Sequence, residues 1–157
     1  MEEIVKILIA DDNRAIIDFI KTYIEKDNRY KIIGICCDTE EQIRMIDKLK
    51  PDVVITDIKK NNEFTGLEII KKYKAEEYCP IFYVVSASIS YYISELRDLK
   101  IRYYIHKPFE VEDFMRILGY AYNEIFPKEI VVKKQEIEEP PKRIFAIFDT
   151  IKKRIGV

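Results

Sequence analysis

Short apolar runs alternate with longer segments of helical period over residues 1–126, and this alternation limits the possible folds more than any other feature of the chain. The runs VVIT at 53–56 and IFYVV at 81–85 are nearly continuous in apolar residues. Such runs are typical of strands in a parallel sheet that is covered on both faces. The pattern predicts strands at residues 4–10, 31–36, 52–56, 80–85 and 102–105.

The intervening segments place their apolar residues at helical spacing. Ile17, Ile20 and Ile24 fall on one stripe. Asp38 or Thr39 is a suitable cap for the second helix. The pattern predicts helices at residues 14–26, 39–49, 66–75, 90–99 and 111–126. Five βα units joined by right-handed crossovers form an α/β fold, a (βα)5 doubly wound sheet of five parallel strands.

The character of the chain changes after residue 126. Residues 127–143 are charged and contain the pair Pro140-Pro141, as is typical of a linker. Residues 144–157 predict a short amphipathic helix, which we expect to fold back on the domain or to pair with a second copy. We therefore expect a domain at 1–126, a linker at 127–143 and a helical tail at 144–157. The tail is too short for an independent DNA-reading domain, so we expect no direct DNA binding.

Composition narrows the class of protein. The formal net charge is −1 and 48% of the residues are hydrophobic, which indicates a globular chain without a polyanion-binding signature. Cys36, Cys37 and Cys79 lack the spacing of a metal or redox motif, and we expect them to be buried and reduced. The sequence begins without a signal peptide or a transmembrane-length apolar stretch, so we expect a cytoplasmic protein.

Polar residues follow the predicted strands at the edge where open α/β sheets bind ligands. These are Asp11 and Asp12 after the first strand, Asp57 after the third, Ser86 after the fourth and Lys107 after the fifth. Three neighbouring carboxylates need a cation, and oxygen ligands favour Mg²⁺. With the lysine and the hydroxyl they suit a phosphoryl group carried on a carboxylate. Asp12 is also a suitable cap for the first helix.

Four motifs carry a family resemblance. ILIADDN, VVITDIK, YVVSAS and YYIHKPF, in this order and spacing, resemble the signatures of the CheY-like receiver domain of two-component response regulators. The resemblance covers residues 3–123 and implies the flavodoxin/CheY-like sheet order. It also implies that a sensor histidine kinase or a phosphotransfer protein supplies a phosphoryl group.

The resemblance assigns the acceptor and the metal ligands by position. Asp57 corresponds to the phosphoacceptor nucleophile. Asp12 corresponds to a direct Mg²⁺ ligand, and Asp11 to a ligand acting mainly through water. Asp57 and the backbone carbonyl of Lys59 complete the implied metal site.

The resemblance also assigns residues that bind the phosphoryl group and respond to it. Lys107 pairs with the phosphoryl oxygens, and its bond to Pro108 is expected to be cis. Ser86 and the amide of Ala87 donate hydrogen bonds to the same group. Tyr104 corresponds to an aromatic switch that turns inward when Ser86 moves, as expected for two packings of similar energy. The expected activity is self-phosphorylation and slow autodephosphorylation rather than turnover of external substrates.

The sequence departs from the family pattern after the acceptor. The segment KKNNEFTG at 59–66 lacks the usual Met-Pro and Asp-Gly pairs and has one extra residue, which leaves the loop conformation and the phosphoryl lifetime open. We expect Lys59 to influence the attacking water. For output, we expect a downstream protein or a second copy to contact one of two surfaces. The first is the face formed by the predicted helix 90–99, strand 102–105 and helix 111–126, where several tyrosines lie, and the second is the C-terminal helix.

Other function classes fit less well or remain open. An FMN site would need a phosphate loop after the first strand, where Asp11 and Asp12 would repel phosphate. An aspartyl phosphatase usually has a second carboxylate two residues after the nucleophile, where this chain has Lys59. A phosphorylation-independent interaction module and a receiver fragment of a longer regulator remain open as alternatives.

Overall fold

The computed structural model describes residues 3–59, 63 and 65–128. Within these residues the strands form one parallel sheet in the order β2-β1-β3-β4-β5. The order confirms the predicted doubly wound topology, because the chain moves outward from β1 first to one side and then to the other. The strands are β1 Val5–Ala10, β2 Tyr30–Cys36, β3 Val53–Thr56, β4 Ile81–Ser86 and β5 Tyr103–His106.

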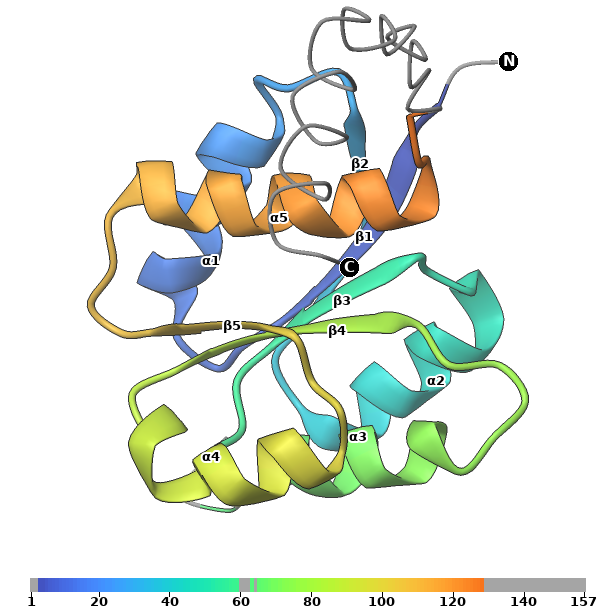
Figure 1. Cartoon of the computed structure of the whole chain (residues 1–157), viewed down its shortest axis with the longest axis vertical. Coiled ribbons are helices and arrows are strands. Elements are labelled where there is room, and N and C mark those ends of the chain that lie inside the picture. The colour runs from blue at the N-terminus through green and yellow to red at the C-terminus, as the bar shows by residue number, and fades with distance from the viewer. Residues whose placement is uncertain (1–2, 60–62, 64, 129–157) are drawn as a thin grey trace, which may run out of the picture.

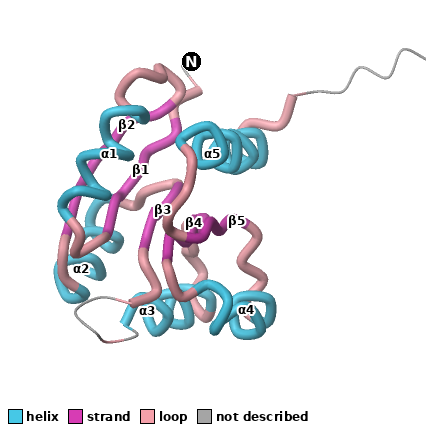
Figure 2. The backbone as a smooth tube through the Cα atoms, turned by 90° about the vertical axis from the view of Figure 1, so that its left-hand side faces the viewer, coloured by secondary structure: helices cyan, strands magenta, loops and turns pink. Residues whose placement is uncertain are grey.

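The described helices cover both faces of this sheet (Figure 1). Helices α1 and α5 pack on one face, and α2, α3 and α4 pack on the other, as the turned view also shows (Figure 2). Their bounds are α1 Arg14–Ile24, α2 Thr39–Leu49, α3 Thr65–Lys74, α4 Ile89–Asp98 and α5 Val111–Ile125. Predicted and observed bounds agree within one or two residues.

The sheet separates two apolar cores. Val54 lies in the core beneath α2, α3 and α4. Val53 and Ile55 lie in the core beneath α1 and α5. All three side chains are buried, which explains why strand β3 is apolar at consecutive positions rather than at alternate ones.

The structure confirms the expected cap of helix α2 and contradicts the expected cap of helix α1. Asp38 caps α2, where its carboxylate accepts a hydrogen bond from the backbone of Glu41 at 2.8 Å. The expectation that Asp12 caps α1 is wrong. Asn13 caps this helix instead, and its side-chain oxygen accepts from the backbone of Ala15 at 3.0 Å. This leaves Asp12 outside the helix, on the loop that leads into it.

The cysteines also differ from expectation. Cys36 is buried at the end of β2, but Cys37 and Cys79 are exposed. The prediction of three buried thiols is therefore wrong for two of them, because both lie in connecting segments beyond the ends of buried elements.

The helices of the described residues include none with the length and apolar character that a membrane span requires. The predicted tail helix and nearly all of the predicted linker lie outside the described residues.

Candidate functional site

The sheet register brings the predicted residues to one edge. Ala10 of β1 and Thr56 of β3 are paired, so Asp11 and Asp57 leave neighbouring strands at the same level. Hydrogen bonds continue this pairing beyond the strands, because the Asp57 amide donates to the carbonyl of Ala10 at 3.3 Å. On the other side of β4, the Lys107 amide donates to the carbonyl of Ser86 at 3.0 Å.

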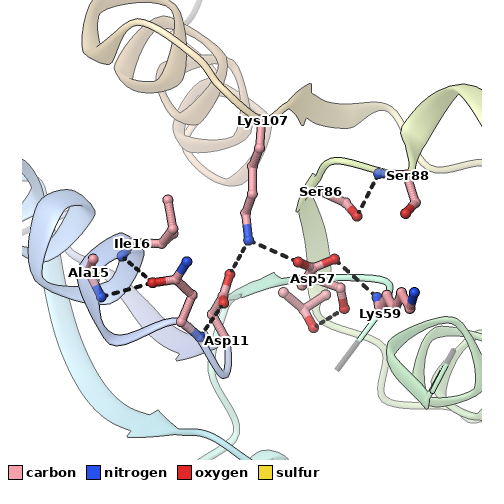
Figure 3. A network of polar contacts seen from close by, with 10 residues as sticks. Asp11, Ala15, Ile16, Asp57, Lys59, Ser86, Ser88 and Lys107 are labelled. Carbon is pink, nitrogen blue, oxygen red and sulfur yellow. Dashed lines mark hydrogen bonds and ion pairs between the residues drawn. The ribbon is translucent and has the colours of Figure 1, made fainter. Parts of the chain in front are cut away.

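Lys107 joins the two carboxylates of this edge (Figure 3). Its Nζ lies 2.7 Å from Asp11 Oδ2 and 2.8 Å from Asp57 Oδ2. The Lys107 side chain is only 15% exposed, and both carboxylates are less exposed still. The three groups therefore interact with little screening by water, unlike an ordinary surface ion pair.

The second oxygen of each carboxylate is bound by the backbone. Asp11 Oδ1 accepts from the Asn13 amide at 2.8 Å. Asp57 Oδ1 accepts from the Lys59 amide at 3.0 Å. Each carboxylate thus has one oxygen on a backbone N–H and the other on Lys107, which fixes the rotation of both side chains.

The ionisation of these groups follows from the same contacts. Burial raises the pKa of the Asp11 carboxyl above its ordinary value, although hydrogen bonds from Lys107 and Asn13 oppose the shift. Burial alone would lower the pKa of Lys107, but its bonds with Asp11 and Asp57 outweigh that effect and raise the pKa. Burial prevails at Asp11 because this carboxylate shares its one cation with Asp57, whereas at Lys107 the two anionic partners together outweigh burial. Lys107 is therefore a fixed cation at neutral pH.

The predicted switch residues lie at the end of β4 and on β5. Ser86 is buried, and its Oγ accepts from the Ser88 amide at 3.2 Å, while Ala87 is exposed. Tyr104 on β5 is 38% exposed. The bond between Lys107 and Pro108 is cis, as the resemblance implies.

The donor set of the site suits a hard divalent cation. Among the described residues, no group of three or more His, Cys, Asp or Glu side chains is arranged to hold a metal ion. Asp11 and Asp57 meet at Lys107, while Asp12 follows on the same loop with an exposed side chain. Mg²⁺ is commonly held by one or two carboxylates and keeps several waters, so this arrangement of oxygen donors fits it.

Sequence reasoning missed two buried polar residues behind the acceptor. Gln42 of α2 and Thr56 of β3 are buried, and Gln42 Nε2 donates to Thr56 Oγ1 at 3.2 Å. Thr56 Oγ1 donates in turn to the carbonyl oxygen of Asp57 at 3.1 Å. The available signal was a polar residue one turn before Ile46 on the buried stripe of the helix.

Comparison with known proteins gives the family from sequence and the same fold from solved structures. Residues 7–118 match the response regulator receiver domain family. The chain is 28% identical over 135 residues to the transcriptional regulatory protein YdfI of Bacillus subtilis, a match that covers 85% of this chain and 63% of that protein. It is 24% identical over 139 residues to the transcriptional regulatory protein PdtaR of Mycobacterium tuberculosis, covering 88% of this chain and 66% of that one. The chain thus spans just under two thirds of each relative.

A solved structure agrees with the fold. The response regulatory domain of mrkE from Klebsiella pneumoniae superposes with a TM-score of 0.71 at 17% identity, covering 78% of this chain and 99% of that domain. The family match extends over Asp11, Asp57, Ser86 and Lys107, and the described helices and strands have the receiver topology. The chain therefore belongs to the response regulator receiver domain family of two-component signalling.

Proposed function

We propose that this chain accepts a phosphoryl group on Asp57 in a Mg²⁺-dependent reaction and that the modification switches a protein-interaction surface. The donor would be a sensor histidine kinase or a phosphotransfer protein, as is usual for receiver domains. The observation that supports this function most directly is the position of Lys107 Nζ, which lies within 2.8 Å of both Asp11 and Asp57 at a nearly buried edge of the sheet. This arrangement combines a nucleophile with a fixed cation.

The chemistry needs little more from the protein than position and charge. A carboxylate oxygen of Asp57 forms the new bond to phosphorus while the bond from phosphorus to the donor breaks, and the leaving atom keeps the electron pair. Lys107 neutralises charge on the transferring oxygens. Asp11, Asp12, Asp57 and the carbonyl of Lys59 would hold Mg²⁺, which supplies further neutralisation of the phosphoryl oxygens.

The switch would begin at Ser86. Its Oγ accepts from the Ser88 amide, and a hydroxyl that accepts a hydrogen bond keeps its own hydrogen to donate to a phosphoryl oxygen. The amide of Ala87 would bind the same group. Tyr104 is partly exposed on β5 and could then pack inward, which changes the surface around it.

The same face carries the most exposed aromatic side chains of the described residues. Tyr91 on α4 is 85% exposed and Tyr120 on α5 is 51% exposed, and the edge strand β5 connects these two helices along the chain. Exposed aromatic rings favour protein contacts. We propose this face for a downstream protein target or a second copy of the chain, with residues 129–157 as a further contact outside the described part.

The lengths of the relatives favour a second candidate for output. YdfI and PdtaR are both named transcriptional regulatory proteins, and each is longer than the matched region. The second candidate is therefore that this chain is the receiver part of a longer regulator, with the output domain missing from this sequence. Direct DNA binding by the present chain is still not expected, and a phosphorylation-independent interaction module remains the alternative if Asp57 accepts no phosphoryl group.

Intact mass measurement tests the proposal. The protein is incubated with Mg²⁺ and acetyl phosphate beside the variant Asp57→Asn. We expect one added phosphoryl group in the parent protein that requires Mg²⁺ and is absent from the variant. An adduct of equal amount in the variant would contradict the assignment. No adduct in the parent, together with no structural response to beryllofluoride, would contradict the function itself.

A further inference from the structure

A short line of buried hydrogen bonds connects helix α2 to the backbone of the acceptor. Gln42 Nε2 donates to Thr56 Oγ1 at 3.2 Å, and Thr56 Oγ1 donates to the carbonyl oxygen of Asp57 at 3.1 Å. Gln42 is 0% exposed and Thr56 is 1% exposed. The line reaches Asp57 from the side of the sheet that α2 covers, and it ends on the main chain rather than on the carboxylate.

The donors and acceptors of this line are consistent with one another. A hydroxyl has a single hydrogen, and Thr56 gives it to the carbonyl of Asp57. The hydroxyl can therefore only accept from Gln42, which requires the amide nitrogen of Gln42 to face it. Two apolar side chains could fill the same space without the cost of burying polar groups. The polar pair therefore indicates a role other than packing.

The carbonyl of Asp57 is confined from a second direction. A Cβ atom added to Gly66 would lie 1.9 Å from the Asp57 carbonyl oxygen, so the backbones are in close contact there. The Gly66 amide also donates to the carbonyl of Ile58 at 3.0 Å. The peptide that follows Asp57 is thus held between the Thr56 hydroxyl and the first turn of α3.

The direction of this peptide determines how the acceptor side chain is presented. The chain continues from it to Lys59, whose amide donates to Asp57 Oδ1 at 3.0 Å. The other oxygen of the same carboxylate is on Lys107 at 2.8 Å. A rotation of the peptide after Asp57 would move the Lys59 amide and release one of the two constraints on the carboxylate.

We propose that Gln42 and Thr56 are positioning residues for the acceptor Asp57. Their hydrogen bonds hold the peptide after Asp57 in the orientation that presents its carboxylate for attack on phosphorus. The expected effect on the phosphorylation rate rests on the proposed function. The expected change at the Lys59 amide does not. The line ends on the main-chain carbonyl of Asp57, so both residues act through its backbone.

The kinetic test compares two substitutions of one residue. Thr56→Val keeps the shape but removes the hydroxyl, and Thr56→Ser keeps the hydroxyl. We expect Thr56→Val to lower the rate of phosphorylation by acetyl phosphate at saturating Mg²⁺ about tenfold to a hundredfold, because small misplacements of a nucleophile have effects of this size. Thr56→Ser should stay close to the parent rate. Equal rates for Thr56→Val and the parent would overturn the inference, and so would an equally slow Thr56→Ser.

A double-mutant cycle and a control separate positioning from general loss of stability. Gln42→Met removes the first donor of the line, and its effect on the rate should be much smaller in the Thr56→Val background than in the parent, as for residues that act together. Fully additive effects would overturn the inference. Ile46→Val shortens a buried side chain on the same helix but removes no hydrogen bond of the line, and it should leave the rate unchanged at a temperature where every variant is folded.

A second measurement decides the inference even if the parent accepts no phosphoryl group. Hydrogen exchange of the Lys59 backbone amide reports its bond to Asp57 Oδ1 directly. We expect this amide to exchange faster in Thr56→Val and at the parent rate in Thr56→Ser and Ile46→Val. Unchanged exchange in Thr56→Val would overturn the positioning role. Failure of phosphorylation with the expected exchange pattern would contradict only the proposed function.

Discussion

Lys107 Nζ lies 2.8 Å from Asp57 Oδ2, although the two residues are 50 positions apart in the sequence. The same nitrogen contacts Asp11, so one cation offsets two nearly buried carboxylates. A phosphoryl group or a divalent cation that enters this edge must share or replace those contacts. The state of Lys107 therefore connects the stability of the domain with its chemistry.

Removing the lysine charge should affect both properties. Lys107→Met leaves Asp11 and Asp57 without their common partner, which should lower the free energy of unfolding by about 3 kcal/mol at neutral pH. The rate of phosphorylation by acetyl phosphate should fall about a hundredfold, because a positioned cation no longer stabilises the transferring oxygens. Urea unfolding and intact mass measure the two effects. Lys48→Met, at an exposed position of α2, is the matched control and should change neither; a parent-like rate for Lys107→Met would argue against its role.

The raised pKa of Asp11 predicts a pH-dependent effect of its substitution. Because burial raises this pKa in the folded protein, the folded state binds a proton more readily than the unfolded state, and ionised Asp11 reduces stability at neutral pH. Asp11→Asn keeps an acceptor for the Asn13 amide and should raise Tm by about 2–4 °C at pH 7 in EDTA. The gain should shrink as the pH falls through the folded-state pKa of Asp11. Thermal unfolding from pH 7 to pH 4 measures it, and a gain that grows on acidification would contradict the assignment.

Mg²⁺ should stabilise the parent protein, because a ligand that binds only the folded state shifts unfolding by mass action. At a hundredfold excess over Kd the expected gain is about 2.7 kcal/mol. The gain should be strongly reduced in Asp12→Asn and retained in Glu112→Gln, which changes an exposed carboxylate at the start of α5. Thermal unfolding with and without Mg²⁺ gives the comparison. Equal stabilisation of Asp12→Asn and the parent would exclude Asp12 as a ligand.

Gly66 offers a steric test of the backbone behind the acceptor. In Gly66→Ala the new Cβ would lie 1.9 Å from the carbonyl oxygen of Asp57, so the loop must shift. We expect a loss of about 1–3 kcal/mol in the free energy of unfolding, together with slower phosphorylation. Gly119→Ala is the control, because its Cβ would come no closer than 4.0 Å to its nearest neighbour, Arg29, and alanine favours the helix. Similar unfolding free energies and rates for the two variants would contradict this account.

Much of the fold followed from patterns that are local in sequence. Continuous apolar runs indicated strands covered on both faces, and the residues directly after those runs met at one edge because parallel strands end there together. The contact of Lys107 with Asp11 and Asp57 agrees with that expectation, and the cis bond before Pro108 was implied by the family resemblance.

The features that sequence reasoning missed depend on contacts between distant segments or on choices between neighbours. Gln42 lies on the buried stripe of its helix, but the sequence does not identify its partner Thr56, which lies 14 residues away. Asn13 and Asp12 are both good caps, and only the geometry of the turn selects one of them. Exposure of Cys37 and Cys79 depends on where a strand or helix ends, which periodicity locates only to within a few residues.

Locating the phosphoryl group at one residue tests the central claim most directly. The protein is treated with acetyl phosphate and Mg²⁺, reduced with borohydride, which converts an aspartyl phosphate to homoserine, and analysed by peptide mass spectrometry. We predict homoserine at position 57, dependent on Mg²⁺, with all other aspartates unchanged. Homoserine at a different aspartate, or a phosphorylated protein with Asp57 intact, would contradict the account.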